Sequence, residues 1–189
     1  MLLIEIIRKI SYSIHADRIG PDLPFTHWRL LFPGSMKRMC QKKFKRFADS
    51  ADFRAGAYAV GCSRISIGER VIVRPGCMLF GESQTLETSI TIEDDVMMGA
   101  GVHFYINNHR FDRLDIPLID QGYYPDEPVV LKRGCWIGAN TILLPGVTVG
   151  QNSVVGAGSV VTKSIPDGVV AFGNPARVRG KVGESAAAV

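Results

Sequence analysis

A period of six residues constrains this chain more than any other feature of its sequence. Residues 137–166 divide into the blocks IGANTI, LLPGVT, VGQNSV, VGAGSV and VTKSIP, and each block opens with an aliphatic residue. The same register continues backwards with interruptions, and all twelve opening positions are apolar: Ile67, Val73, Leu79, Ile92, Met98, Phe104, Leu131, Ile137, Leu143, Val149, Val155 and Val161. A strand repeats every two residues and a helix every ~3.6, so neither element alone explains the period.

Short strands joined by tight turns do explain a period of six. Three blocks then form one coil of about 18 residues, and each opening residue points inward and stacks on its equivalents in the coils above and below. The corners of such a coil favour residues without a bulky side chain, and the blocks carry Gly138, Gly146, Gly150, Gly156 and Gly158. The sequence therefore predicts an all-β fold, a parallel β-helix.

The chain is expected to form one main domain with an added N-terminal part. Its 189 residues, of which 46% are hydrophobic and 21% charged, are ordinary for a globular protein. We predict a helical extension over residues 1–55, the β-helix over 56–181 with a projecting loop at 110–130, and a flexible tail over 182–189. Two apolar sets at helical spacing support the extension; they are Leu3, Ile6, Ile7, Ile10 and Ile14, and Met36, Met39, Cys40, Phe44 and Phe47.

The blocks from Ile67 onward, followed by GNPARV at residues 173–178, resemble the left-handed β-helix hexapeptide-repeat acyltransferases. The resemblance covers residues 67–181 and is strongest to the maltose, galactoside and polysaccharide O-acetyltransferase branch. It implies a left-handed coil, a homotrimer, and acetyl-CoA as the acyl donor, held in a groove between neighbouring solenoids. The expected reaction moves the acetyl group to a hydroxyl of a saccharide acceptor, in surface polysaccharide or lipopolysaccharide biosynthesis.

His109 stands where the repeat is interrupted, because it closes the block FYINNH and the next recognisable block begins at Leu131. Connections of this length are usually functional or disordered. The family's catalytic histidine falls on His109, so the resemblance implies a general base that takes the proton of the acceptor hydroxyl. A backbone N–H near Gly138 would stabilise the resulting oxyanion. The residues alone leave a merely exposed or packed histidine open, and Asp112 is more simply a solvated carboxylate than its partner.

The resemblance also implies a set of coenzyme-binding residues. A tryptophan is expected near the acetyl end, a glycine beside the reacting carbonyl, two alanines along the pantetheine arm, and a threonine and three cations near the phosphates: Trp136, Gly138, Ala139, Ala157, Thr162, Lys163, Arg177 and Arg179. Guanidinium groups suit bidentate contacts with phosphate. The alternatives are corner packing for Trp136 and a solvated basic tail for the arginines.

No metal and no nucleic-acid partner is expected. The four cysteines show no CxxC pair or zinc spacing, and the β-helix holds two histidines, His103 and His109, short of the three ligands of a catalytic zinc site. Cys77 and Cys135 fall on inward positions of their blocks and are expected to be inert buried thiols.

Two other functions stay open: N-acetylation of an amino sugar or xenobiotic, and a non-catalytic β-helix scaffold.

The acceptor and the N-terminal extension are less sharply defined. Residues 79–89 hold no asparagine that matches the family's acceptor-binding residue, and Glu82 lies nearby. Six cations occur in residues 37–46, and basic amphipathic segments bind anionic membrane surfaces. One interpretation is therefore peripheral contact with the inner face of the cell membrane. The other, which we favour, is that both helices pack on the solenoid or cap its open end. A start without a cleavage site predicts a cytoplasmic location.

Overall fold

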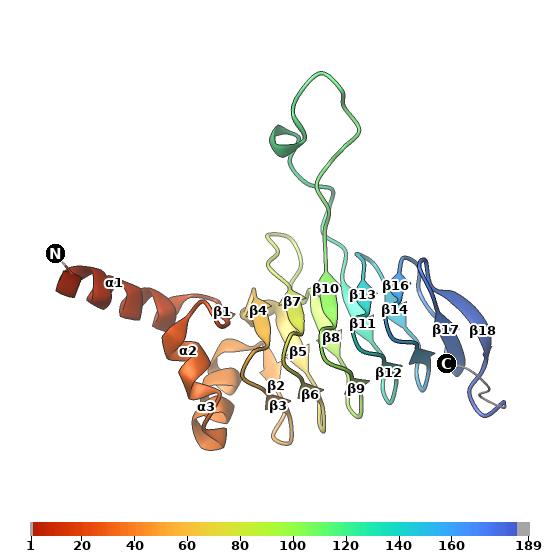
Figure 1. Cartoon of the computed structure of the whole chain (residues 1–189), viewed down its shortest axis with the longest axis horizontal. Coiled ribbons are helices and arrows are strands. Elements are labelled where there is room, and N and C mark those ends of the chain that lie inside the picture. The colour runs from red at the N-terminus through yellow and green to blue at the C-terminus, as the bar shows by residue number, and fades with distance from the viewer. Residues whose placement is uncertain (1, 185–189) are drawn as a thin grey trace.

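The computed structural model describes residues 2–184 and shows a three-sided parallel β-helix with helices at its N-terminal end and one long projecting loop (Figure 1). Successive strands of the solenoid turn from one side to the next, and every third strand returns to the same side. The register pairs residues 18 apart where no loop intervenes, such as Ile142 with Val160 and Trp136 with Val154. The predicted hexapeptide β-helix is confirmed.

The first side is a six-stranded sheet in the order β1-β4-β7-β10-β13-β16. Its strands are β1 (Arg18–Ile19), β4 (Tyr58–Val60), β7 (Met78–Phe80), β10 (His103–Tyr105), β13 (Ile142–Leu143) and β16 (Val160–Val161). The second side is a five-stranded sheet in the order β14-β11-β8-β5-β2. Its strands are β2 (Arg46–Phe47), β5 (Ile65–Ile67), β8 (Ile90–Ile92), β11 (Val129–Leu131) and β14 (Thr148–Val149).

The third side holds two sheets, the pair β3-β6 and a five-stranded sheet in the order β18-β17-β15-β12-β9. These strands are β3 (Asp52–Phe53), β6 (Ile72–Val73), β9 (Met97–Met98), β12 (Trp136–Ile137), β15 (Val154–Val155), β17 (Val169–Phe172) and β18 (Arg177–Lys181). All strand pairs are parallel except two, β1 with β4 and β17 with β18. Both antiparallel pairs lie at the end of a sheet.

The core is the inner column that the six-residue period predicts. All twelve opening residues are buried, from Ile67 to Val161. The small residues at the fifth positions are buried too, and their hydroxyls are satisfied by corner carbonyls: Thr141 Oγ1 donates to the Gly138 oxygen at 2.8 Å and Ser159 Oγ to the Gly156 oxygen at 2.6 Å. Buried hydroxyls without such acceptors would be costly.

Two kinds of constraint select glycine at the corners. Gly146 has φ +75°, a left-handed conformation that side chains disfavour. Gly138 is needed for a different reason, since a Cβ there would lie 2.4 Å from the Ala157 nitrogen of the next coil. Its smallness is therefore explained by coil-to-coil packing, whether or not a coenzyme lies beside it.

The strand pairing of the solenoid begins earlier than the predicted boundary at residue 56. Strand β2 pairs with β5 so that Phe47 stands beside Ile67, and β3 pairs with β6 so that Phe53 stands beside Val73. Phe47 and Phe53 are buried inside the first coil. Phe47 thus belongs to a strand and not to a helix, because the last helix ends four residues before it.

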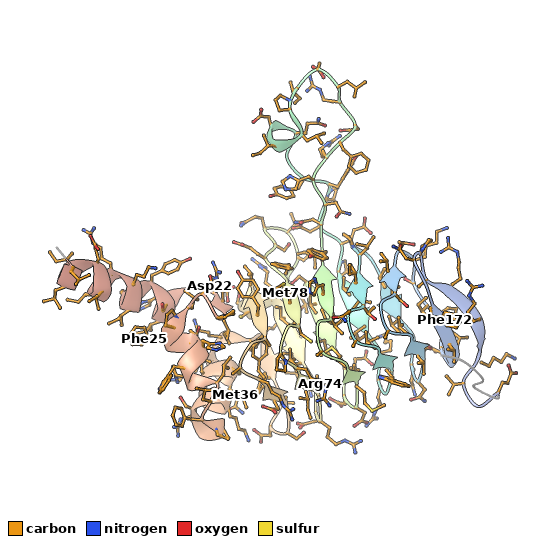
Figure 2. All side chains as sticks on the ribbon, viewed as in Figure 1. Asp22, Phe25, Met36, Arg74, Met78 and Phe172 are labelled. Atoms are coloured by element: carbon orange, nitrogen blue, oxygen red, sulfur yellow. The ribbon has the colours of Figure 1, made fainter. Side chains whose placement is uncertain are left out.

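Three helices precede the solenoid: α1 (Leu2–His15), α2 (Pro24–Arg29) and α3 (Pro33–Lys43). Helix α3 buries Met36, Met39 and Cys40 against the first coil, and the Phe44 ring behind it lies 5.5 Å from that of Phe53. The predicted end cap is therefore present in α3. Helix α1 differs, because Ser13 is its one buried residue and its N-terminal part extends away from the solenoid (Figure 1), as the side-chain view in Figure 2 also shows for the ribbon. The interpretation that both helices pack on the solenoid is wrong for α1.

The projecting loop leaves the solenoid after β10 and returns at β11, so it spans residues 106–128 and includes the short helix η2 (Leu118–Asp120). The predicted loop at 110–130 is present with both ends shifted. The C-terminal segment follows β18, where the Val182 N–H donates to the Gly168 oxygen at 2.8 Å. Of the predicted tail, residues 185–189 lie outside the described residues.

The four cysteines are free and buried. Burial raises the pKa of the Cys40 and Cys135 thiols to about 12 and also raises the pKa of Cys62 and Cys77. The expected inertness of Cys77 and Cys135 is in keeping with these shifts, since the thiolate is the reactive form. In the described part of the chain, no helix combines the length and apolarity that crossing a membrane requires.

Candidate active site

His109 lies at the root of the projecting loop, where the two chain segments of the loop run side by side. His109 forms an antiparallel bridge with Tyr123, and the Tyr124 N–H donates to the Asn108 oxygen at 2.9 Å. The imidazole is exposed, and its ring centre lies 4.2 Å from that of Tyr123. The short ladder holds the imidazole above the solenoid instead of letting it swing with the loop tip.

Asp112 does not face His109. Its carboxylate accepts a hydrogen bond from the Arg110 guanidinium at 2.6 Å, and this pairing lowers the pKa of Asp112. The structure therefore supports the simpler interpretation of Asp112 as a surface carboxylate.

Asp126 fastens the base of the loop to the neighbouring coil. Its carboxylate accepts hydrogen bonds from Ser83 Oγ at 2.6 Å and from Asn107 Nδ2 at 2.7 Å, and a longer one from Thr85 Oγ1. Burial opposes ionisation of Asp126, but the hydrogen bonds from Ser83, Asn107 and Thr85 outweigh it and lower its pKa. One ionised carboxylate thus joins the two ends of the projecting loop to the 81–89 loop.

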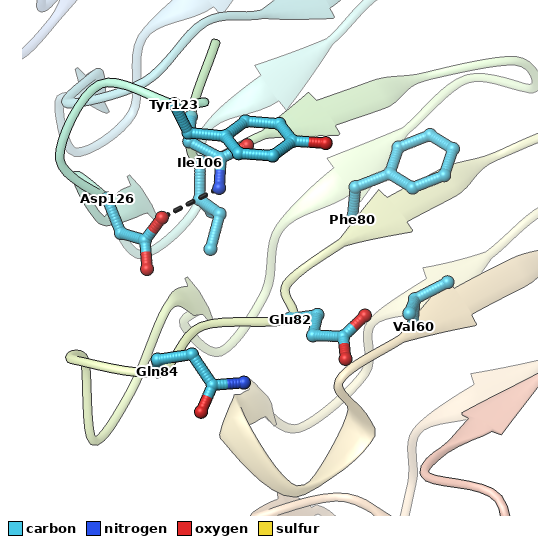
Figure 3. A pocket seen from close by; sticks show the side chains of 8 residues that line it. Val60, Phe80, Glu82, Gln84, Ile106, Tyr123 and Asp126 are labelled. Atoms are coloured by element: carbon cyan, nitrogen blue, oxygen red, sulfur yellow. Dashed lines mark hydrogen bonds between the residues drawn. The ribbon is translucent and has the colours of Figure 1, made fainter. Parts of the chain in front are cut away.

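A pocket of about 510 Å³ opens between these two loops (Figure 3). Its lining mixes apolar and hydrogen-bonding side chains; the residues are Val60, Phe80, Ile106 and Tyr123, with Glu82, Gln84, Asn107 and Asp126. Aromatic and aliphatic surface with a few polar groups is the usual composition of a small-molecule site. Because Tyr123 lines the pocket and stacks on His109, the imidazole stands at its margin.

The coenzyme residues predicted from the sequence lie on two different corners of the solenoid. The corner that precedes the six-stranded sheet contains Gly138, Ala139 and Ala157, and we call it the alanine corner. The corner that follows this sheet contains both loops, His109 and residues 162–163, and we call it the loop corner. Strands β13 and β16 separate the two corners within one chain.

Along the alanine corner the predicted residues lie one after another parallel to the solenoid axis. Trp136 is half exposed on β12 beside a groove of about 360 Å³ that it shares with Arg74 and Met97. The corners of Ala139 and Ala157 stack directly, with the Gly158 N–H donating to the Ala139 oxygen at 2.8 Å. The two arginines of β18 stand exposed at the far end of the same side. An elongated ligand laid along this corner would meet an indole first and guanidinium groups last.

The backbone N–H of Gly138 is not available for an oxyanion. It donates to the Val155 oxygen at 2.8 Å as part of the coil-to-coil ladder. The expectation of an oxyanion donor near Gly138 is thus wrong for that group itself.

Comparison with known proteins decides the family. Residues 128–163 match the family described as bacterial transferase hexapeptide (six repeats). Galactoside O-acetyltransferase of Lactococcus lactis subsp. lactis (strain IL1403) is 32% identical over 154 residues, which are 81% of this chain and 70% of that protein. The chain belongs to the hexapeptide-repeat acetyltransferases. The predicted resemblance to the maltose and galactoside enzymes is confirmed.

Solved structures agree with the fold of this acetyltransferase. A maltose O-acetyltransferase from Clostridium difficile 630 superposes with a TM-score of 0.68 and 31% identity, covering 80% of this chain and 76% of that one. A galactoside acetyltransferase in complex with coenzyme A gives a TM-score of 0.72 and 25% identity, covering 96% of this chain and 80% of that one.

Several residues of the pocket in this acetyltransferase have no recognisable signature in the sequence. Asn107, Tyr123 and Asp126 are distributed over a loop without a repeat, so no spacing connects them. One signal is present, since Asn107 lies two residues before His109 in the block FYINNH. Glu82, which the sequence places near the expected acceptor-binding position, does line the pocket.

Proposed function

We propose that this acetyltransferase moves the acetyl group of acetyl-CoA to a hydroxyl of a saccharide. The observation that carries the proposal is the pocket of about 510 Å³ beside His109. A sugar offers an apolar ring face to Phe80 and Ile106, and hydroxyls to Glu82, Gln84 and Asn107. Such a combination of apolar and polar lining fixes the orientation of a ligand.

In the proposed reaction His109 is the general base. Its imidazole takes the proton from the acceptor hydroxyl while the hydroxyl oxygen bonds to the thioester carbonyl carbon. The tetrahedral intermediate collapses with cleavage of the carbon–sulfur bond, and the departing thiolate receives the proton from the imidazolium. No acyl-enzyme is needed, in keeping with the buried, weakly acidic thiols of the chain.

We further propose that the enzyme works as a homotrimer and that its site is completed between two copies. The support is the division of the site within one chain, because His109 and Trp136 belong to different corners. Joining the loop corner of one copy to the alanine corner of the next would bring the base to the acetyl end of the coenzyme. Exposed Leu114 and Ile119 at the loop tip are apolar surface that such a neighbour could cover.

We propose that the saccharide belongs to a surface polysaccharide or its precursor. The support is the strongly basic N-terminal part, which would bring the enzyme to an anionic membrane surface where such glycans are assembled. Under this proposal the protein works in the cytoplasm, at the inner face of the membrane.

Calorimetric titration of coenzyme A, with an acceptor screen by thiol release, tests the proposal. We expect saturable binding that Arg177→Glu weakens more for coenzyme A than for dephospho-coenzyme A, because a guanidinium suits a phosphate. Turnover with sugars but not with amines would support O-acetylation. Amine acceptors alone would favour N-acetylation, and absence of coenzyme binding would favour a non-catalytic scaffold.

A further inference from the structure

Helix α1 exposes more apolar surface than its place in this chain explains. Six of its leucine and isoleucine side chains are between 45% and 70% exposed: Leu2, Leu3, Ile4, Ile6, Ile7 and Ile14. The helix is attached mainly at its C-terminal end, where Ser13 is buried and Lys43 Nζ donates to the Ile14 oxygen at 3.1 Å. Contiguous exposed apolar surface of this kind marks an interaction site.

The apolar residues of α1 form one broad face. At about 100° per residue, Leu3, Ile7, Ile10 and Ile14 form a central row, Ile4 widens it on one side, and Leu2 and Ile6 widen it on the other. Two small serines, Ser11 and Ser13, fall within the widened margins. The central row alone has the spacing of a coiled-coil seam, which is a narrow stripe. The wider face would leave Ile4, Leu2 and Ile6 uncovered by a single partner helix, whereas a bilayer surface covers the whole face.

The charges of α1 are placed as a bilayer surface requires. On the same projection Arg8 and Lys9 border the apolar face on its two sides, and Glu5 lies between them at the centre of the polar side. Long basic side chains at such borders keep their apolar stems beside lipid and their charges at the headgroups. Glu5 is exposed and, with Lys9 and Asp22, lines the groove between α1 and α2 on the side away from the central row.

The formal charge of the chain is also unevenly distributed, with most of the excess positive charge in the N-terminal part. Residues 1–45 hold nine Lys and Arg against three Asp and Glu, whereas the rest of the chain holds thirteen against fifteen. Part of this charge gathers beside the end of α1, around a pocket of about 610 Å³ lined by Arg29, Lys42 and Lys43 together with one acidic residue, Asp17. The elements that carry the exposed apolar face are thus the basic part of the molecule, and the solenoid is slightly acidic.

Aromatic side chains extend the apolar surface onto α2. Phe25 lines a pocket of about 620 Å³ together with Leu2 and Ile6 of α1. Trp28 is 64% exposed one helical turn later. Tryptophan is enriched where protein meets the membrane–water boundary.

We propose that α1, with its border cations and the adjoining exposed residues of α2, is a docking surface for an anionic phospholipid bilayer. The helix lies in the plane of the headgroups, with Leu3, Ile7 and Ile14 towards the acyl chains. The solenoid remains in water, and acetyl transfer does not depend on the contact.

Vesicle cosedimentation of the full chain tests the proposal. Binding to vesicles of phosphatidylcholine with phosphatidylglycerol should exceed binding to phosphatidylcholine alone and should fall as salt rises. Ile7→Asn should weaken it at least about tenfold, since a buried isoleucine is lost. Val182→Asn, a similar change at an exposed position of the C-terminal end of the solenoid, should leave it unchanged. Arg8→Gln with Lys9→Gln should weaken binding about thirtyfold.

Light scattering and acetyl transfer on the same variants separate the other outcomes. We expect Ile7→Asn to keep the mass and the activity of the parent protein. A lower mass would show that α1 joins copies of the chain and would overturn the proposal. Equal binding to both vesicle types, or none to either, would overturn it as well.

Discussion

The imidazole of His109 lies at the root of the projecting loop, where we propose that it acts as the general base. His109→Ala should lower kcat by about 10²–10⁴-fold, the usual contribution of a general base, and leave coenzyme A affinity within about twofold. Thiol release and calorimetry measure the two effects. His103→Ala is the matched control, because His103 points outward from β10 and contacts Tyr105. An active His109→Ala enzyme would remove the proposed role.

The stability of the loop base should depend on pH through the ionisation of Asp126. Its pKa is lowered in the folded chain, so its ionised form stabilises the loop above the ordinary aspartate pKa of about 4, and this contribution is lost as the pH falls through the lowered value. Asp126→Asn should reduce kcat/KM about tenfold at neutral pH by loosening the loop base. Hydrogen exchange of residues 107–125 should rise in parallel. Asp115→Asn, at a residue paired only with nearby Arg113, should change neither.

Individual elements of the solenoid carry the stability of the fold. Phe104 is fully buried inside the coil of β10, so Phe104→Ala should cost about 3–5 kcal/mol in the free energy of unfolding. Urea denaturation measures this cost. Phe111→Ala removes the same side chain from the projecting loop, where it is exposed, and should have little effect. Comparable losses for both variants would mean that the loop contributes to the folded core.

The repeating elements were predictable because one physical requirement, an apolar residue at every sixth position, recurs with little change. The first coil was not predictable from the repeat, for a local reason. Phe47, Phe53 and Ala59 also follow a spacing of six and stand beside Ile67, Val73 and Leu79. Extra residues at the short helix η1 (Cys62–Arg64) break the register after Ala59. The loop pocket could not be predicted, because its residues come together through folding and not through a repeat.

At the scale of the whole molecule, the division of the site between two corners makes a quantitative prediction. His109→Ala damages the loop corner, and Ala157→Phe should block the alanine corner, where the Ala157 side chain is exposed. Each variant alone should be inactive. When the two are coexpressed in equal amounts, about one quarter of the sites of a cyclic trimer would combine two intact corners. Activity near that fraction, absent when separately purified variants are mixed, supports a shared site. No recovery would place the whole site within one chain.

The uneven distribution of charge between the helical end and the solenoid should also affect how the whole molecule approaches a membrane. Because the basic residues gather at the helical end, an anionic surface would attract that end first and orient the molecule before contact. Raising the ionic strength should therefore slow vesicle association strongly and change the rate of dissociation less. Stopped-flow mixing measures both rates. Equal effects of salt on the two rates would argue against orientation by charge.

The two antiparallel strands also bear on how the molecule avoids becoming a filament. A stack of identical parallel coils has no intrinsic stopping point, since each coil offers the next the same row of backbone groups. β1 and β18 run against the direction of the stack at opposite ends, and α3 covers the first coil. A second solenoid that arrives end to end meets one reversed strand at either end, so the template for further stacking is incomplete. This reduces the tendency of a long, repetitive core to template its own aggregation.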